Sequence, residues 1–598
     1  MQSIKGLLVA LFFFYWLGEA LAQAPSPDIP AMTWRLVEVR GADQAAQRLM
    51  AGAGIEIVGK ESKGGLQALV NRAQQQWLDS LGLFTRVLIE DYGRWLAERN
   101  RAEAGLAAPQ DLADGSLGGY FSPQEILAFV DSLIAGDTHG IISDTMIIGF
   151  STWQNPLWVV KISAAPNADQ DLPEVFFNSL IHAREAMSGM VLLYFMRYLV
   201  DNYGVTDSVT DLVDSRELYF MPLVNPDGYQ INWDNYRNTG GFGLWRKNAR
   251  DNNNNGALDQ LLDGVDLNRN FPFQWGNIDF DYSSSSNPGS DSYRGASAAS
   301  EPETKALIDF INKRSFTAAI NLHTYSAVLI NPFNYRDLRT PDSLLYDRLA
   351  GLLTAGNGYG HGNAIETLGY PANGELTDWE YADSASRGKI MSWTGEIGAT
   401  KNGFWPARTE IPLEQKKNLA MLADLAKIAG FWPTLDSLAQ VRAQPDSSRL
   451  HLRFRLSNLG ILPNREKITV RLKVEAGGEF NPQDSVSPGD LSVAAVPPSE
   501  RDSLLVDLSG SSGYYPAALE VYEGGRKLRS FAFQLKGNLS PFDLTRDGKT
   551  NIFDLLDMLR ILASDQPTGA DWSAYDLNHD GKVTVLDLIV LLKDLAKK

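Results

Sequence analysis

Cysteine is absent from this chain of 598 residues. Disulfide scaffolds, thiol nucleophiles, iron–sulfur clusters and cysteine-held zinc are therefore excluded. Histidine is scarce too, with six residues in the whole sequence. A zinc ion would have to be held by a few histidines together with carboxylates.

An excess of positive charge is also lacking. The chain has 54 Lys and Arg against 72 Asp and Glu, a net charge of -18. Such an acidic protein is poorly suited to binding nucleic acid or coating an anionic membrane. The composition, 44% hydrophobic and 10% aromatic, is that of a globular protein, and the length predicts about four domains.

Long apolar runs are missing except at the N-terminus. There Lys5 precedes the run 7–17, and Ala20-Leu21-Ala22 follows as a signal-peptidase pattern. We interpret residues 1–22 as a cleaved signal peptide and expect a secreted protein. A membrane anchor is the alternative, but the run is shorter than the ~20 residues that span a bilayer.

The next part of the chain predicts a small domain and a connector. Residues 23–100 alternate between strand-like and helical patterns, in the order β-α-β-α-β, with the second helix starting at Leu69. Residues 101–116 are rich in Ala, Gly and Asp, which is typical of an exposed linker.

Three further domains are expected. Residues 117–435 alternate apolar strands with helices, which predicts an α/β domain with a mixed, mainly parallel sheet covered by helices. Residues 436–536 contain short alternating strands separated by Gly, Pro and Asn, which predicts a β-sandwich. Residues 537–598 hold an internal repeat with two apolar helices.

Two predicted strands end in residues that bind metals. His182 follows the strand EVFFNSLI with Glu185 three positions later, and His323 ends the strand AINLH. The carboxyl ends of parallel strands are where α/β sheets place ligand sites. Two histidines and a glutamate suffice for a catalytic zinc with one position open to water. Taken alone, the His-Glu pair is more often a structural hydrogen bond than a metal site, and it would not predict a metal.

Several short motifs together make a family resemblance specific. The chain from about 118 to 433 resembles the secreted zinc metallocarboxypeptidases. The motifs occur in the order PEVFFNSLIHAREAMS (173–188), PLVNPDGY (222–229), LWRKNAR (244–250), GVDLNRNF (264–271), INLHTYS (320–326), GYPANGELTDW (369–379) and WTGEIG (393–398).

The resemblance implies roles for individual residues. The zinc ligands would be His182, Glu185 and His323. Glu396 would be the general base and acid, which suits a carboxylate that moves the proton of an activated water. Arg246 would stabilise the oxyanion. The substrate's terminal carboxylate and neighbouring groups would be bound by Arg184, Asn268, Arg269 and Tyr370.

Two residues of the motif 369–379 bear on specificity. In the resembling enzymes this stretch lines the pocket for the terminal side chain. Thr377 stands at the position that often separates hydrophobic from basic preference. Glu375 could pair with a terminal Lys or Arg. We therefore predict mixed hydrophobic and basic specificity, the alternative being that Glu375 points to solvent.

The unit 34–100 resembles the pro-segments that precede such peptidases. A permanently attached accessory domain is the alternative. A pro-segment would be removed by cleavage in the connector near 99–116.

Two segments 33 residues apart, 543–554 and 576–587, have the spacing of calcium loops, with Gly at position 6. The duplication resembles dockerin modules, which attach enzymes to cohesin partners; an alternative is that the repeat only stabilises the C-terminus. The expected ligand positions are Asp543, Thr545, Asp547, Lys549, Asn551, Asp554, Asp576, Asn578, Asp580, Lys582, Thr584 and Asp587.

A third oxygen-rich stretch runs from Asp251 to Asp259. Asp251, Asn253, Asn255 and Gly256 repeat the start of a calcium loop. The sequence therefore suggests a third calcium site, with a plain polar turn as the alternative.

The leading hypothesis is a secreted zinc carboxypeptidase with one zinc and two or three calcium ions, acting on peptides or proteins. A cell-wall peptide hydrolase of a related branch is a second hypothesis. A calcium-dependent assembly or adhesion protein with a silent peptidase domain is a third.

Overall fold

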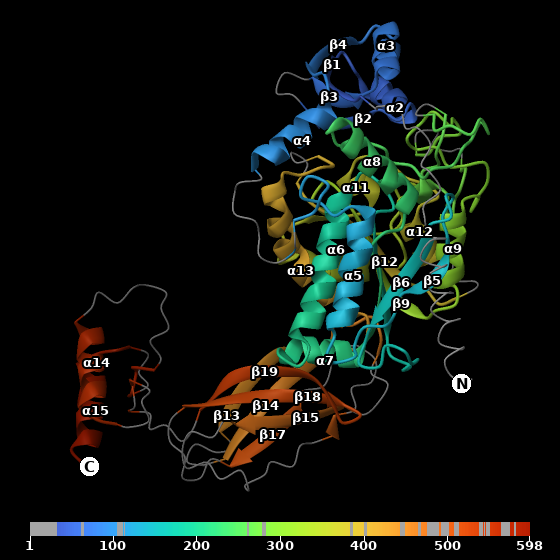
Figure 1. Cartoon of the computed structure of the whole chain (residues 1–598). Helices are drawn as coiled ribbons and strands as arrows, with labels where there is room; N and C mark the ends of the chain where they lie inside the picture. Colours follow the sequence, from blue (N-terminus) through green and yellow to red (C-terminus); the bar gives the residue numbers. More distant parts are fainter. Residues whose placement is uncertain are drawn as a thin grey trace, which may run out of the picture. The chain divides into compact units, whose positions relative to one another are not determined.

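The computed structural model describes residues 33–60, 65–103, 112, 114–259, 262–277, 283–382, 387–399, 403–442, 449–463, 468–474, 490–491, 502–507, 514–536, 542, 544–545, 550–563, 574–578 and 582–597. The expected signal peptide lies outside these residues. The chain divides into two compact units, 1–429 and 430–598, which are described separately (Figure 1).

The first unit begins with a small α+β fold. Its antiparallel sheet has the order β2-β3-β1-β4. The elements are β1 (Arg35–Arg40), α2 (Gln44–Gly52), β2 (Glu56–Lys60), β3 (Leu66–Val70), α3 (Arg72–Ser80), β4 (Phe84–Ile89) and α4 (Tyr92–Ala102). The sequence interpretation missed β3 and was wrong to start a helix at Leu69. Asn71 caps α3 through a capping box, so the helix begins only after it.

The connector is less exposed than the sequence predicts. Helix α4 continues through Ala102, and Leu112 is buried. Glu103 accepts hydrogen bonds from the backbone and hydroxyl of Thr409. The connector is therefore held at both ends, by the hydrogen bonds of Glu103 and by the burial of Leu112. Residues 104–111, between them, lie outside the described residues.

The centre of this unit is an eight-stranded mixed sheet of order β11-β10-β12-β9-β7-β8-β6-β5. Four adjacent strands, β12, β9, β7 and β8, are parallel, and β10, β6 and β5 include antiparallel pairings. The bounds are β5 (Met146–Phe150), β6 (Pro156–Ile162), β7 (Glu174–Ser179), β8 (Glu217–Met221), β9 (Phe316–His323), β10 (Val328–Ile330), β11 (Gly360–Gly362) and β12 (Met391–Glu396). The prediction of a mixed α/β sheet is confirmed.

Helices cover this sheet (Figure 1). Helix α6 packs against β7 and β9, and α12 packs against β9 and β12. Every residue of β7 is buried, as expected for a strand with both faces covered. The helices are α5 (Pro123–Gly136), α6 (Ala186–Asn202), α7 (Asp207–Ser215), α8 (Pro226–Thr239), η2 (Leu267–Arg269), α9 (Pro302–Ile311), α10 (Ser343–Thr354), α11 (Ala364–Thr367), α12 (Leu376–Ala382), η5 (Arg408–Glu410) and α13 (Ile411–Ile428).

The second unit contains two antiparallel sheets that share one hydrophobic core. Their orders are β13-β14-β17 and β16-β15-β18-β19. The bounds are β13 (Pro433–Arg442), β14 (Arg449–Asn458), β15 (Ile468–Val474), β16 (Asp490–Leu491), β17 (Asp502–Asp507), β18 (Tyr514–Glu523) and β19 (Arg526–Lys536). Two helices follow, α14 (Ile552–Leu562) and α15 (Val585–Leu595), which pack through a small core of their own. Among the described residues, none of the helices is both long and apolar enough to traverse a bilayer.

Candidate active site

Three neighbouring parallel strands bring the central residues together. His323 ends β9, Glu396 ends β12 in register with it, and His182 follows β7 on the other side of β9. Because the carboxyl ends of parallel strands share one edge of a sheet, these side chains meet there. Glu185 joins them from the residue just before α6.

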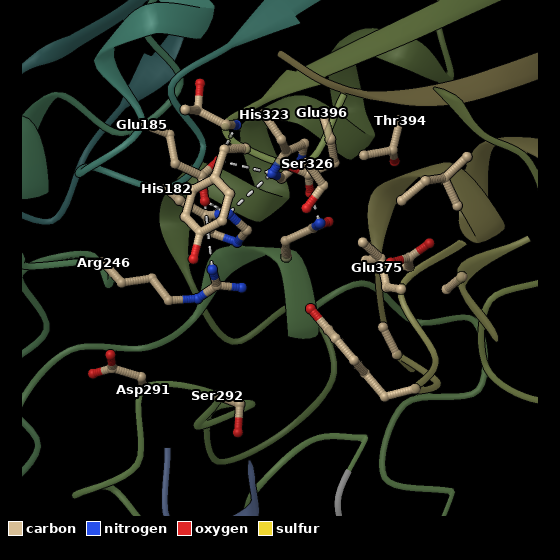
Figure 2. Close-up of a pocket in the computed structure, with 18 of the residues that line it drawn as sticks. His182, Glu185, Arg246, Asp291, Ser292, His323, Ser326, Glu375, Thr394 and Glu396 are labelled. Atoms are coloured by element: carbon tan, nitrogen blue, oxygen red, sulfur yellow. Dashed lines mark hydrogen bonds and ion pairs between the residues drawn. The ribbon is translucent and has the colours of Figure 1, made fainter. Parts of the chain in front are cut away.

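His182, Glu185 and His323 form the one group of three metal-ligating side chains found in the described part of the chain. Figure 2 shows the three pointing toward one another. The Nδ1 atoms of the two histidines are 3.0 Å apart, and the Glu185 carboxylate lies 2.8 Å from one and 3.0 Å from the other. All three are buried. Two imidazole nitrogens and a carboxylate converging in this way fit a zinc ion, for which this is a known catalytic donor set.

A buried carboxylate fixes the tautomer of His182. Asp266 Oδ1 lies 3.2 Å from His182 Nε2, so Nε2 carries the proton and Nδ1 keeps its lone pair for a metal. Burial, and then the charge of Arg246, lower the pKa of His182 below its ordinary value. Burial alone would raise the pKa of Glu185, but the neighbouring histidines hold it well below its ordinary value. These protonation states are the ones that ligate metals.

Arg246 is held beside the three donors. Its Nε and Nη2 each lie 3.0 Å from Asp266 Oδ2, and its Nη1 lies 3.6 Å from Glu185. The backbone carbonyl of Arg246 also accepts from the N–H of Ala183. These contacts hold a guanidinium, which is always charged, next to the three donors.

A cavity of about 450 Å³ opens on this centre. It is lined by every predicted zinc, catalytic and substrate residue except Thr377: His182, Arg184, Glu185, Arg246, Asn268, Arg269, His323, Tyr370, Glu375 and Glu396. The sequence thus located one site from segments that lie more than 200 residues apart.

Arg269 and Asn268 lie in η2, whose N-cap is Asp266. Arg269 is buried and donates through Nε to Ser283 and through Nη1 to the carbonyl of Asn268. Asn268 accepts from the backbone N–H of Leu376. These bonds fix a planar guanidinium at the cavity wall, a geometry suited to a carboxylate.

Arg184 lies at another part of the wall. Its Nη1 donates to Asp291 at 2.9 Å, and its guanidinium stacks 4.1 Å from the centre of the Phe404 ring. Asp291 was not singled out from the sequence, because a lone Asp in a Ser-rich stretch carries no signal.

Glu375 and Thr394 lie on the side of the cavity away from His182 and Glu185 (Figure 2). Glu375 is 6% exposed and lines the cavity, so its side chain does not point to solvent. Thr377 does not line the cavity and lies behind Thr394, which does. Its hydroxyl lies 2.6 Å from that of Thr394 and accepts a hydrogen bond from the side chain of Asn321. Tyr370 is 47% exposed at the cavity mouth.

Sequence reasoning missed Asp266, Thr394 and Asn334. The first two stand within the quoted motifs GVDLNRNF and WTGEIG, so the signal was available. Asn334 stands in no quoted motif, and only the fold brings it to Glu375.

Three residues of the N-terminal fold also line the cavity. They are Gly54, Ile55 and Ile57, at the turn before β2 and within it. Gly54 has a φ of +68°, and a Cβ there would stand 2.5 Å from the backbone nitrogen of Asp291. The backbone turn thus sits directly on the cavity wall.

The calcium loops are described in part. Asp543, Asp547, Lys549 and Asp580 lie outside the described residues. Asp554 and Asp587, at position 12, are both fully buried, and each accepts from backbone N–H groups of its own loop and first helical turn. The two predicted calcium loops therefore share the same hydrogen-bonding pattern at position 12. Calcium at the remaining predicted positions stays a prediction.

The loop 251–259 is closed by its own hydrogen bonds. Asp251 accepts from the N–H groups of Asn255 and Gly256, and Asp259 accepts from the side chains of Asn253 and Asn255. A polar turn accounts for these bonds, and calcium in this loop stays a prediction.

Comparison with known families agrees with the geometry. Residues 129–421 match the zinc carboxypeptidase family, and residues 541–596 match the dockerin type I domain. Carboxypeptidase A4 of Mus musculus is 30% identical over 358 residues, 58% of this chain and 79% of that protein. Carboxypeptidase A1 of Bos taurus is 28% identical over 361 residues, 59% of this chain and 80% of that protein.

Solved structures show the same fold. The carboxypeptidase A of Helicoverpa armigera aligns with a TM-score of 0.55 at 22% identity, covering 67% of this chain and 98% of that one. Thrombin activatable fibrinolysis inhibitor aligns with a TM-score of 0.52 at 25% identity, covering 66% and 98%. The chain therefore belongs to the zinc carboxypeptidases and carries a C-terminal dockerin type I domain.

Proposed function

We propose that the protein hydrolyses the C-terminal peptide bond of peptides or proteins, with mixed preference for hydrophobic and basic terminal residues. The observation that carries this proposal is the presence of Arg269 and Asn268 in the same cavity as the three metal donors and Glu396. A guanidinium at that place pairs with a free terminal carboxylate, which an internal peptide bond does not present.

His182, Glu185 and His323 would hold the zinc ion. When bound, zinc supplies a Lewis acid and lowers the pKa of a bound water to about 7. Asp266 keeps His182 in the ligating tautomer and anchors Arg246 at the same time. One carboxylate thus couples the metal ligands to the arginine.

Glu396 would move the proton. It ends β12 beside His323 and lines the cavity, where it can take a proton from the attacking water and deliver it to the leaving amine. Such proton transfer is worth roughly 10²–10⁴ in rate.

Arg246 would stabilise the negative charge that develops on the carbonyl oxygen. Its two bonds to Asp266 orient the guanidinium before the substrate arrives, so little reorganisation is needed during the reaction. Arg184 and Tyr370 would contact the substrate further along the cavity.

Glu375 would select among terminal side chains. It is buried in the cavity wall and can pair with a terminal Lys or Arg, while Leu368, Ala364 and Ile330 line apolar parts of the same cavity. Both classes of side chain would therefore be accepted. A Glu375→Gln variant should lose kcat/KM selectively for C-terminal Lys and Arg.

The direct test of exopeptidase action compares N-blocked dipeptides that have a free C-terminal carboxylate with the same dipeptides as C-terminal amides. The free acids should be cleaved and the amides should not. Arg269→Gln should lower kcat/KM for the free acids sharply. Arg339→Gln is the matched control, because Arg339 is an exposed arginine outside the cavity. Equal cleavage of acids and amides would contradict the proposal.

Residues 33–103 would act as an inhibitory pro-segment, because Gly54, Ile55 and Ile57 occupy one wall of the substrate cavity. Arg99, Asn100 and Arg101 lie in helix α4 and donate to backbone carbonyls of the peptidase domain, so they offer no unstructured backbone to a protease, and cleavage in the connector would fall beyond Glu103. Trimmed protein should cleave long peptides faster than the full chain. Equal rates would favour an accessory domain.

The protein would be exported by a signal peptide at residues 1–22 and would carry a β-sandwich domain at 436–536. The dockerin domain would bind two calcium ions and attach the enzyme to a cohesin-like partner. Binding of the full chain to a cohesin in calcium, and its loss in chelator, tests this part. The complete set of catalytic residues disfavours a silent peptidase domain.

A further inference from the structure

Two buried residues lie directly behind Glu375 and do not line the cavity. Asn334 donates a hydrogen bond from its side-chain amide to Glu375 Oε1. The backbone N–H of Asn334 lies 2.9 Å from both carboxyl oxygens of Asp378, and that of Tyr335 lies 3.1 Å from one of them. Asn334 therefore binds two acidic side chains at once.

The position of Asn334 is fixed on every side. It is 1% exposed; its side-chain oxygen accepts from the N–H of Ala364 at 2.8 Å, and its carbonyl accepts from Ala372 at 2.8 Å. Ala364 and Ala372 line the cavity. Because all its polar groups are used, Asn334 holds the Glu375 carboxyl in one place.

The two acids are not balanced by a bonded cation. Among the described residues, no Lys or Arg side chain forms an ion pair with Glu375 or Asp378, although both are buried. Burial raises the pKa of Glu375, and burial followed by the charge of Glu375 raises that of Asp378. The pair therefore resists carrying two negative charges.

Other charged groups also face Glu375. Arg269 from η2 and the Asn334 amide favour its ionised form, as does His323 at the end of β9, while Asp266 opposes it. Arg269, His323 and Asp266 remain in place when Asn334 is changed, so the contribution of the Asn334 amide can be measured separately.

We propose that Asn334 is a positioning residue that holds Glu375 in its ionised form and thereby sets the balance between basic and hydrophobic terminal residues. This inference rests on the proposed function of Glu375 in the specificity pocket. A proton and a terminal Lys or Arg compete for the same buried carboxylate. Basic substrates are preferred when Glu375 is ionised, and neutral side chains are accepted when it is protonated.

Asn334 acts on Glu375 through its side-chain amide, which donates to the carboxylate and favours ionisation, so its loss raises the pKa of Glu375. Asp378 accepts from the backbone N–H groups of Asn334 and Tyr335 and thereby holds Asn334 in place. The structure thus contains a built-in pH dependence of specificity that loss of the Asn334 amide should move to higher pH.

The experiment measures kcat/KM against pH for two N-blocked dipeptides, one ending in Arg and one in Phe, with trimmed enzyme. The ratio of the two values cancels titrations that affect both substrates, including those at the catalytic centre. In the wild type the Arg/Phe ratio should rise with pH. Asn334→Ala should shift that rise to higher pH by about one pH unit.

Asn363→Ala is the matched control. Asn363 is another buried asparagine next to Ala364, and it caps α11 without contacting Glu375. Its ratio profile should follow the wild type. If Asn334→Ala does not fold, Asn334→Ser should give a shift in the same direction, since it too lacks the amide donor.

An unmoved profile in Asn334→Ala, or a shift to lower pH, would overturn the proposal. Glu375→Gln separates this result from the proposed function. If Glu375→Gln loses Arg substrates selectively while Asn334→Ala leaves the profile unmoved, only the inference fails. If Glu375→Gln affects both substrates equally, the specificity role of Glu375 itself fails.

Discussion

Asp266→Asn should disable the site although Asp266 is neither a proposed zinc ligand nor a proposed substrate-binding residue. Asp266 is fully buried and accepts four hydrogen bonds: one from His182 Nε2, one from the backbone of Asn268 and two from Arg246. An amide has one acceptor oxygen, so its NH₂ group must face either the His182 side or the Arg246 side. Either orientation leaves two donors without an acceptor.

The magnitude follows from these contacts. Loss of a partner that orients a metal-binding histidine typically costs about 10–100-fold in metal affinity. Misplacement of an oxyanion donor costs about 10²–10³ in rate. We therefore expect the zinc dissociation constant to rise by about one to two orders of magnitude. At saturating zinc, kcat/KM should still be lower by roughly 10²–10³ because Arg246 has lost its anchor.

The assay is a titration of apoenzyme in zinc buffers, followed by kcat/KM on an N-blocked dipeptide at saturating zinc. Asp263→Asn is the matched control. Asp263 is equally buried and accepts from the N–H groups of Asn252 and Asp259, but it contacts neither His182 nor Arg246. Zinc affinity and kcat/KM within about twofold of wild type in Asp266→Asn would refute the role of this carboxylate; such a change is below the 10-fold that this class of contact produces.

Three further predictions follow from named residues. Glu396→Gln should keep its zinc, measured by metal analysis after dialysis, while kcat falls by roughly 10²–10⁴; near-normal turnover would remove Glu396 from the mechanism. Glu380 is fully buried, and its Oε1 has no hydrogen-bond partner among the described residues. Burial raises its pKa from 4.5 to about 7, so the folded form stays protonated between these values while the unfolded form ionises. Glu380 alone should therefore lower the stability of the wild type by roughly 3 kcal/mol as pH rises from below 4.5 to above 7. The stability difference between wild type and Glu380→Gln should change by about this amount between pH 4 and pH 8 in unfolding experiments; a difference that does not depend on pH would contradict this. Millimolar calcium should slow proteolysis within residues 537–598 of the full chain, because ligand binding stabilises the folded module; unchanged cleavage would argue against calcium in the double loop.

The grouping of the candidate site residues around one cavity could be predicted from the sequence because these residues lie within dense motifs at strand ends. His182, His323 and Glu396 each follow or end an apolar strand, and parallel strands deliver their carboxyl ends to one edge. The position of β9 between β7 and β12 could not be deduced from the sequence. The order of the motifs nevertheless predicted that His182, His323 and Glu396 lie together.

Residues that act from behind the cavity were not predictable. Asn334 has no motif of its own, and its contacts with Glu375 and Asp378 depend on tertiary packing across 41 and 44 residues. Strand β3 was mistaken for the start of a helix because Leu69 and Val70 directly precede the strongly helical run 72–80. The sequence pattern did not show that strand β3 ends at Val70. The capping box of Asn71 sets the start of helix α3.

The central claim is that hydrolysis of a terminal peptide bond depends on one zinc ion held by His182, Glu185 and His323. The most direct measurement titrates zinc into chelator-treated, trimmed enzyme while cleavage of an N-blocked dipeptide with a free carboxylate is recorded. The account predicts no activity without metal, a linear rise that ends at one zinc per chain, and no recovery in His323→Ala at the same total zinc. Full activity in the chelated enzyme, or equal recovery in His323→Ala, would contradict it.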